Sequence, residues 1–167
     1  MVACIIVAII AYLIGSINFS VILSKKMAGF DVREKGSGNA GTTNMLRAVG
    51  KKAAAITLIC DILKGVVAIL IAMFIGNIVK STNSALLVQI AGIAVIIGHT
   101  FPIFFKFKGG KGVATSLGVL IMSNWQIGLI CLVFALILMV LTQMVSVGSI
   151  AAAILYPVLT LFIPDNY

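Results

Sequence analysis

Residues 53–75 read AAAITLICDILKGVVAILIAMFI, an apolar run that carries only two charged side chains, Asp61 and Lys64. At about 1.5 Å per residue, a helix of this length crosses the roughly 30 Å hydrocarbon core of a bilayer. Similar runs occupy approximately 2–24, 84–98, 113–123, 126–141 and 148–163. The pattern predicts an all-α integral membrane protein, a polytopic helical bundle of about six transmembrane or partly re-entrant segments. The segment 113–123 is short for a full span, so we expect it to be tilted, broken or re-entrant.

The composition supports one membrane domain. Hydrophobic residues make up 62% of the 167-residue chain and charged residues 10%, whereas soluble proteins average about 25% charged residues. A single soluble core of this size could not bury so much apolar surface, so lipid must be the solvent for most of it. The length fits a single domain over 1–167.

The basic residues indicate how the chain is oriented. Ten of the twelve Lys and Arg residues fall in two connections, 25–52 and 99–112. Alternating spans place both connections on one side, together with the short link 142–147, and the positive-inside rule makes that side the cytoplasm. Lys80 lies on the other side, and the N-terminus is expected outside. Because this rule explains the basic residues, we expect no nucleic-acid partner.

The connection 25–52 contains GSGNAGTTN at 36–44, followed by Arg47. The glycine spacing matches a dinucleotide-binding motif, but that motif requires a preceding strand, and here an apolar helix precedes it. Glycines still let backbone N–H groups approach an anion closely, and an arginine is a bidentate donor for phosphate. The stretch therefore predicts a phosphate-binding loop, with a flexible solvated loop as the alternative.

The connection 99–112 begins at His99 and ends with KFKGGKG at 106–112. It is not a Walker A sequence, because Phe105 occupies the first glycine position and Gly112 follows the lysine. Free amides at the start of the following helix, with lysines beside them, would nevertheless bind phosphate; a basic membrane anchor is the alternative. His99, the only histidine, is either a packing residue or a general base or phosphate ligand.

Three further features carry weaker signals. Asp61 and Lys64, three residues apart, can pair on one helical face, as a functional pair or as a structural one. The stretch TQMVSVGSI at 142–150 offers hydroxyl groups near the same side, although Ser and Gly also pack membrane helices. The three cysteines lie far apart in apolar runs, which predicts neither a disulfide nor a metal site.

Together these motifs resemble a known family, the bacterial acyl-phosphate:glycerol-3-phosphate acyltransferases. The resemblance runs from about Gly15 to Ile150. It rests on GSI at 15–17, GSGN at 36–39 with Thr43, Asn44 and Arg47, DILKG at 61–65, Gly98-His99 with Phe101-Pro102, KFKGGKGVAT at 106–115 and VSVGSI at 145–150.

The resemblance implies transfer of an acyl group from acyl phosphate to the 1-hydroxyl of glycerol 3-phosphate, giving lysophosphatidic acid and phosphate in phospholipid synthesis. The implied partners are these two substrates and membrane lipid, in a bacterial inner or plasma membrane, without a metal or cofactor. The motifs imply catalytic roles for Ser37, Arg47, His99 and Lys111. They imply substrate binding by Gly36, Gly38, Asn39, Gly41, Thr43, Asn44, Lys106, Lys108, Gly109, Gly110, Gly112, Thr115 and Ser146.

Two departures from the family carry expectations of their own. Asn18 stands where the family has proline, a change expected to affect only packing. The family continues with another helix and a cytoplasmic motif containing His and Asn, whereas this sequence ends at Tyr167. We expect either a shortened chain or a partner that completes the site.

An acyl phosphate is already activated, so we expect direct attack by the substrate hydroxyl without a covalent acyl-enzyme. The proton of that hydroxyl passes either to His99 or to the substrate's own phosphate. The alternative class is a small anion or phosphate-ester transporter, suggested by the short segments and by Asp61 and Lys64. A transporter of that kind should show symmetry between its halves, and the sequence has none. A membrane scaffold is the third class.

Overall fold

The computed structural model describes residues 1–79 and 83–163, and every regular element within them is helical. The all-helical class expected from the apolar runs is thus confirmed. The helices are α1 (Val2–Gly15), α2 (Phe19–Ala28), α3 (Thr42–Ala48), α4 (Lys51–Ile78), α5 (Ser84–Thr100), α6 (Val113–Ser123), α7 (Trp125–Thr142) and α8 (Val145–Thr160), with 3-10 turns η1 (Val32–Glu34) and η2 (Ile103–Phe105).

Within the described ranges, four stretches are long and apolar enough to cross a membrane: Val2–Ala28, Lys51–Ile78, Ser84–Phe105 and Trp125–Thr142. Helices α6 and α8, with 11 and 16 residues, are shorter. Large apolar side chains such as Ile59, Phe74 and Ile137 are exposed on the outer faces of the helices. Such extensive apolar exposure would be a liability in water, and it is what a lipid-facing surface requires.

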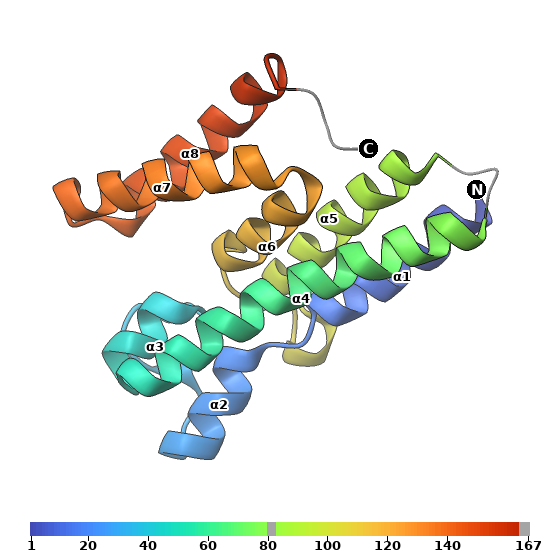
Figure 1. The fold of residues 1–167 in the computed structure, drawn as a ribbon. Coiled ribbons are helices and arrows are strands. Elements are labelled where there is room, and N and C mark those ends of the chain that lie inside the picture. The colour runs from blue at the N-terminus through green and yellow to red at the C-terminus, as the bar shows by residue number, and fades with distance from the viewer. Residues whose placement is uncertain (80–82, 164–167) are drawn as a thin grey trace.

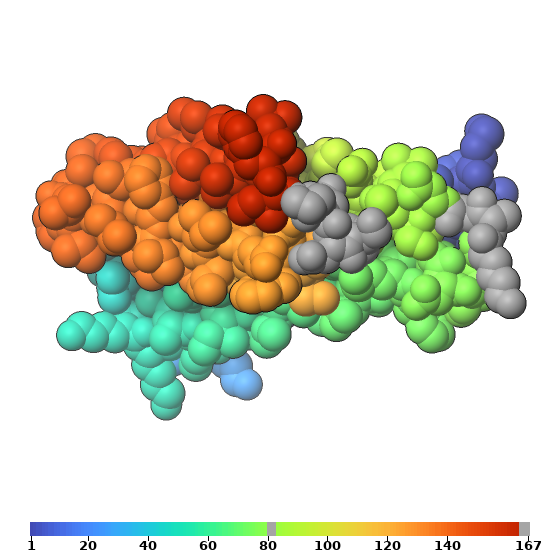
Figure 2. All heavy atoms as spheres, turned by 45° about the horizontal axis from the view of Figure 1, so that its top comes forward, coloured from blue at the N-terminus to red at the C-terminus, as the bar shows by residue number. Residues whose placement is uncertain are grey.

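Helices α1, α4 and α5 form the central bundle (Figure 1). Its core contains Val7 of α1, Ile69 of α4, and Leu87 and Val95 of α5. Helix α6 packs on α4, and α7 connects α6 to α8. Figure 1 places the N-terminus and the start of α5 at one end of the molecule and the short helices α2 and α3 at the other. In the space-filling view, α7 and α8 occupy the upper part of the molecule and α3 and α4 the part below them (Figure 2).

The first apolar segment, expected as one run over 2–24, is divided into α1 and α2 by residues 16–18. Hydrophobicity continues through the break, and side-chain hydrogen bonds are found at both of its edges. The Ser16 hydroxyl donates to the carbonyl of Tyr12 at 2.9 Å. The Asn18 side chain caps α2 by accepting the N–H of Val21 at 3.2 Å.

Two of the expected connections are shorter than the sequence suggested. Helix α8 begins at Val145, so the link 142–147 reduces to Gln143 and Met144 between α7 and α8. The connection 25–52 is partly helical, since it includes the end of α2, all of α3 and the start of α4. Lys80, expected on the opposite side of the membrane, lies outside the described residues.

Helices α4 and α6 touch through glycine. A Cβ atom on Gly118 would overlap the carbonyl oxygen of Ile62, and one on Gly65 would overlap that of Thr115. Small residues at membrane-helix crossings allow this backbone-to-backbone approach. The start of α6 is consequently held against the part of α4 that carries Asp61 and Lys64.

Candidate active site

The first glycine-rich loop folds around the buried amide of Asn44. Its Oδ1 accepts the N–H of Ser37 at 3.0 Å. Its Nδ2 donates to the carbonyls of Val32, Lys35 and Asn39 at 2.9, 3.0 and 3.0 Å, so two protons serve three acceptors. The motif assigned Asn44 to substrate binding; the structure instead uses both of its polar atoms to hold the loop together.

The glycines of this loop supply the turns that the amide requires. Gly36 and Gly38 have φ of 58° and 72°, in the left-handed region that favours glycine. A Cβ atom on Gly36 would also overlap Oδ1 of Asn44. The predicted polar residues Ser37, Thr43 and Arg47 are exposed. The loop therefore presents a hydroxyl-bearing and cationic surface on a fixed backbone.

The second loop, 101–112, folds back onto the end of α5. The N–H of Gly109 donates to the carbonyl of Thr100, and that of Gly110 to the carbonyl of His99, both at 3.1 Å. These two amides, expected to be free for an anion, are thus already used within the protein. The three predicted lysines of the loop, Lys106, Lys108 and Lys111, are all exposed.

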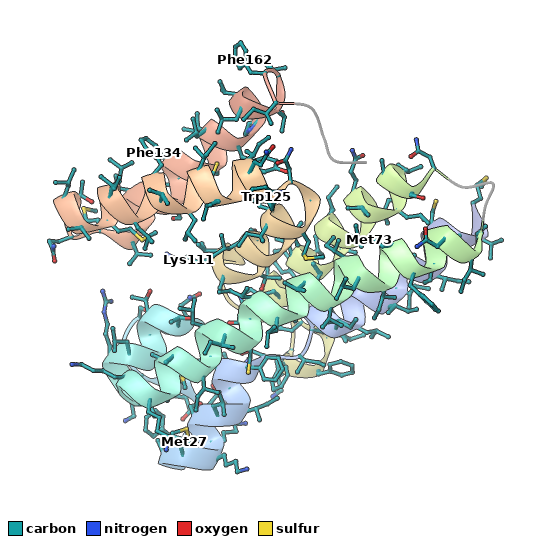
Figure 3. All side chains as sticks on the ribbon, in the orientation of Figure 1. Met27, Met73, Lys111, Trp125, Phe134 and Phe162 are labelled. Atoms are coloured by element: carbon teal, nitrogen blue, oxygen red, sulfur yellow. The ribbon has the colours of Figure 1, made fainter. Side chains whose placement is uncertain are left out.

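Directly after the second loop, the start of α6 offers further backbone N–H groups to an anion. Gly112 precedes the helix with φ of 78°, and its carbonyl accepts the N–H of Ser116 at 2.7 Å. The first N–H groups of a helix have no hydrogen-bond partner within the helix. Those of residues 113–115 therefore point out of the N-terminal end of α6. Thr115 is fully buried, and within the described ranges its Oγ1 has no hydrogen-bond partner. In Figure 3 the Lys111 side chain lies beside this helix start.

Arg33 joins the two loops, and sequence reasoning did not select it. Its Nη1 donates to the carbonyls of Phe105 and Lys108 at 2.8 and 3.0 Å. Its Nε and Nη2 donate to the two carboxylate oxygens of Asp31 at 2.9 and 2.7 Å. In the sequence, the only sign of this role was Asp31, two residues before the arginine. That spacing is too common to predict a contact with residues more than 70 positions away.

The electrostatics of this pair keep it ionised. The hydrogen bond from Arg33 lowers the pKa of Asp31 from its ordinary 3.8 to about 2, against an opposing effect of burial. The same hydrogen bond raises the pKa of the Arg33 guanidinium. Lys25 adds a weaker contact, with Nζ 3.6 Å from Oδ2 of Asp31. The bridge between the loops is consequently charged at any pH near neutrality.

Beneath the loops lies a buried cluster of three ionisable side chains: Asp61, Lys64 and His99. Lys64 Nζ is 2.9 Å from Oδ1 of Asp61 and 2.7 Å from Nδ1 of His99. The pairing expected for Asp61 and Lys64 is thus present and buried inside the bundle. His99, for which the sequence left open a packing role or a role in the site, is buried in the same cluster.

The two glycine loops and His99 meet at Gly110. A Cβ atom on Gly110 would overlap Nε2 of His99 and would lie 2.6 Å from the carbonyl oxygen of Ala40. Ala40 belongs to the first loop and Gly110 to the second. We call this contact the loop junction.

The third predicted stretch lies at the α7–α8 turn. Ser146 is exposed in the first turn of α8, and its carbonyl accepts the hydroxyl of Ser149 at 3.1 Å. Figures 1 and 2 both place this turn toward the same end of the molecule as α3, above it in the view of Figure 1. Helix α8 packs on α7. The stretch thus lies toward the end of the molecule that carries α3, whereas the first two loops touch each other at Ala40 and Gly110.

Comparison with known proteins shows the family to which the chain belongs. A family model described as glycerol-3-phosphate acyltransferase matches residues 5–167. This chain belongs to that family. A glycerol-3-phosphate acyltransferase of Clostridioides difficile is 43% identical over 162 residues, covering 97% of this chain and 79% of the relative. One of Thermoanaerobacter pseudethanolicus is 49% identical over 152 residues, covering 91% and 73%.

Two solved structures share the fold of this acyltransferase family member. They are crystal structures of PlsY (YgiH), described as an integral membrane glycerol 3-phosphate acyltransferase, in a glycerol 3-phosphate form and a lysophosphatidic acid form. Their TM-scores are 0.83 and 0.81, at 39% and 37% identity, and each comparison covers 95% of this chain and 76% of the other. The expectation of an integral membrane bundle is thereby confirmed.

Proposed function

We propose that this protein transfers an acyl group from acyl phosphate to the 1-hydroxyl of glycerol 3-phosphate, yielding lysophosphatidic acid and inorganic phosphate. The observation that carries the proposal is the pair of glycine-rich loops, joined by Arg33 and presenting Arg47, Lys106, Lys108 and Lys111 beside lipid-facing helices. Both substrates carry phosphate, and one carries a long apolar chain. The relatives and the two solved structures are glycerol-3-phosphate acyltransferases, which supports the same reaction.

The chemistry needs no protein nucleophile. The hydroxyl oxygen of glycerol 3-phosphate attacks the acyl carbonyl carbon, and a tetrahedral oxyanion forms. Its collapse breaks the bond between the acyl carbon and the phosphate oxygen, and inorganic phosphate departs with that electron pair. Donors that stabilise the oxyanion and the departing phosphate lower the barrier.

We assign these donor roles to the exposed groups. Arg47 and Lys111 provide positive charge for the substrate phosphates, together with Lys106 and Lys108. Ser37 offers a hydroxyl on the rigid first loop, Ser146 another from the α7–α8 turn, and the amides at the start of α6 a third set. Asn44 and Gly110 act indirectly, by shaping the loops.

The proton of the attacking hydroxyl needs an acceptor, either His99 or the substrate's phosphate. His99 is buried, and its Nδ1 lies 2.7 Å from the Lys64 ammonium. An ammonium group has only protons to offer, so it occupies the lone pair of Nδ1. This arrangement favours the substrate's phosphate as the acceptor.

We further propose that the site faces the cytoplasm of a bacterial inner or plasma membrane. The support is the charge bias of the sequence, since ten of twelve basic residues fall in the two connections that bear the loops. Glycerol 3-phosphate is a soluble anion, and such an orientation gives it direct access. This orientation can be tested by replacing Lys51 with cysteine in oriented membrane vesicles. A membrane-impermeant reagent is then applied from either side, and labelling of the cysteine shows which side it faces.

The deciding experiment incubates the purified protein with palmitoyl phosphate and labelled glycerol 3-phosphate. We expect labelled lysophosphatidic acid and an equal amount of inorganic phosphate. The Arg47→Ala variant serves as the negative control. Uptake of glycerol 3-phosphate or phosphate into proteoliposomes without product formation would instead identify a transporter, and a labelled acyl group retained on any serine would refute direct transfer.

A further inference from the structure

Lys64 has an unusually complete set of partners for a lysine inside a membrane helix. Its ammonium donates to the carbonyls of Gly15 and Ile17, both at 3.2 Å, and to Nδ1 of His99 at 2.7 Å. Asp61 is the counter-charge, with Oδ1 2.9 Å from the same Nζ and 3.6 Å from Nδ1 of His99. The three protons of the ammonium are thus placed among these three acceptors and the Asp61 carboxylate. Beyond its ion-pair partner, Lys64 therefore contacts two other elements.

The first of these elements is the break between α1 and α2. Gly15 ends α1, and Ile17 lies in the break, so neither carbonyl continues a helical ladder there. A cation at this point also complements the negative end of the α1 dipole. The break in turn reaches the second loop, because the Ser16 hydroxyl accepts the N–H of Ile103 at 3.4 Å.

The second element is the imidazole of His99. With Lys64 as an ammonium, which can only donate, a neutral imidazole accepts at Nδ1 and carries its own proton on Nε2. Nε2 is the ring atom beside Gly110, and the Ala40 carbonyl is another near neighbour of that glycine. Lys64 consequently sets both the orientation of the ring and the identity of the atom that it presents to the loop junction.

From this geometry we propose that Lys64 is a positioning residue for the acyl transfer, acting through His99 on the loop junction where the two phosphate loops meet. The inference rests on the proposed function, but its mechanical part stands apart from catalysis. A lysine that merely neutralised Asp61 would require no particular atom at position 99. A lysine that positions the loops requires a hydrogen-bond acceptor there.

The acceptor requirement can be tested with two replacements of the histidine. In His99→Asn the amide Oδ1 can occupy the place of Nδ1 and accept from Lys64, whereas His99→Leu has a similar size and no acceptor. Each is made with Lys64 and with Lys64→Met, which keeps the length of the side chain but has no donor. Leu63→Met is the matched control, because it introduces the same residue one position away, on the lipid-facing side of α4.

Two measurements are made on each variant: the rate of lysophosphatidic acid formation, and the rate of trypsin cleavage after Lys106, Lys108 and Lys111 relative to cleavage after Lys51 and Lys52. We expect Lys64→Met to lower the acyl-transfer rate at least about tenfold and to speed loop cleavage at least about fivefold, with Leu63→Met like the parent protein. We expect His99→Asn to exceed His99→Leu at least about fivefold in rate, and this advantage to disappear in the Lys64→Met background, as for coupled residues.

Several results would overturn the inference: Lys64→Met within about twofold of the parent in both measurements, or an advantage of Asn over Leu that persists without Lys64. If Lys64→Met does not fold, the comparison of His99→Asn with His99→Leu decides, and equal values refute the proposal. If the parent protein makes no product, the proposed function fails, while the cleavage rates still test whether Lys64 holds the loops.

Discussion

Replacement of Asn44 by aspartate is the sharpest test of how the first loop is built. The two side chains have nearly the same shape, and the introduced carboxylate could still accept the N–H of Ser37, which lies 3.0 Å from Oδ1 in the parent. The change removes the two protons of Nδ2, which serve three carbonyls at 2.9 to 3.0 Å. It also directs a carboxylate oxygen toward those carbonyls in a buried position.

The magnitude follows from these contacts. Two lost hydrogen bonds are worth about 1 kcal/mol each, and leaving buried carbonyls unsatisfied costs about 1–3 kcal/mol more. A total of at least about 3 kcal/mol corresponds to a shift of about 100-fold in the equilibrium between ordered and disordered loop. Exposed loops have little local stability to absorb such a loss. We therefore expect the rate of lysophosphatidic acid formation to fall at least about tenfold, with faster trypsin cleavage after Lys35.

Asn83→Asp is the matched control. Asn83 caps α5 by accepting the N–H groups of Ala85 and Leu86, at 3.0 and 3.4 Å, and aspartate caps a helix equally well. We expect this variant to stay within about twofold of the parent. If Asn44→Asp kept more than about a third of the parent rate and an unchanged cleavage pattern, the loop would not depend on this amide as argued.

Four further predictions concern this surface and the contact between α4 and α6 beneath it. Arg33→Met should lower the acyl-transfer rate about tenfold or more by separating the loops, and a rate equal to that of Lys35→Met, an exposed control, would contradict this. Because the pKa of Asp31 is about 2, below its ordinary 3.8, the Asp31–Arg33 pair stabilises the fold fully above about pH 4 and loses that effect as the pH falls through about 2. Thermal stability of the parent relative to Asp31→Asn should thus be constant from about pH 5 to 8, and a difference that shrinks within this window would refute the assignment. Arg47→Ala and Lys111→Ala should each reduce the rate about 100–1000-fold, as loss of one transition-state donor does, with the melting temperature unchanged; full activity in either would remove that residue from the site. Gly65→Leu should abolish folding or lower the melting temperature by several degrees, because its side chain would meet the Thr115 carbonyl, whereas Leu63→Met should leave that temperature unchanged.

The sequence predicted the all-helical class, because long apolar runs can be recognised without knowledge of the fold. The short α6 was also expected, because its apolar run covers only 113–123. Asn124, directly after it, caps α7 by accepting the N–H of Ile127. The break at 16–18 was not, because apolar residues run through it and only the hydrogen bonds of Ser16 and Asn18 mark it.

The candidate site divides in the same way. Exposed cations such as Arg47 and Lys111 were selected from the motifs, and the structure leaves them exposed. The residues that hold the loops were missed or given another role: Arg33 because its partners lie more than 70 residues away, and Asn44 because a buried amide and a ligand-binding amide look alike in a sequence. Contacts of that kind depend on the final fold rather than on local pattern.

The order of two neighbouring residues in α4 has a mechanical consequence. Lys64 contacts His99 beneath the loop junction, and the next residue, Gly65, lies against the backbone of α6. A tilt or translation of α4 would therefore move both of these contacts together. An attempt to widen the enzyme's preference for other alcohols by altering α4 would disturb the whole anion-binding surface, so the α7–α8 turn, which packs separately, is the better place to begin.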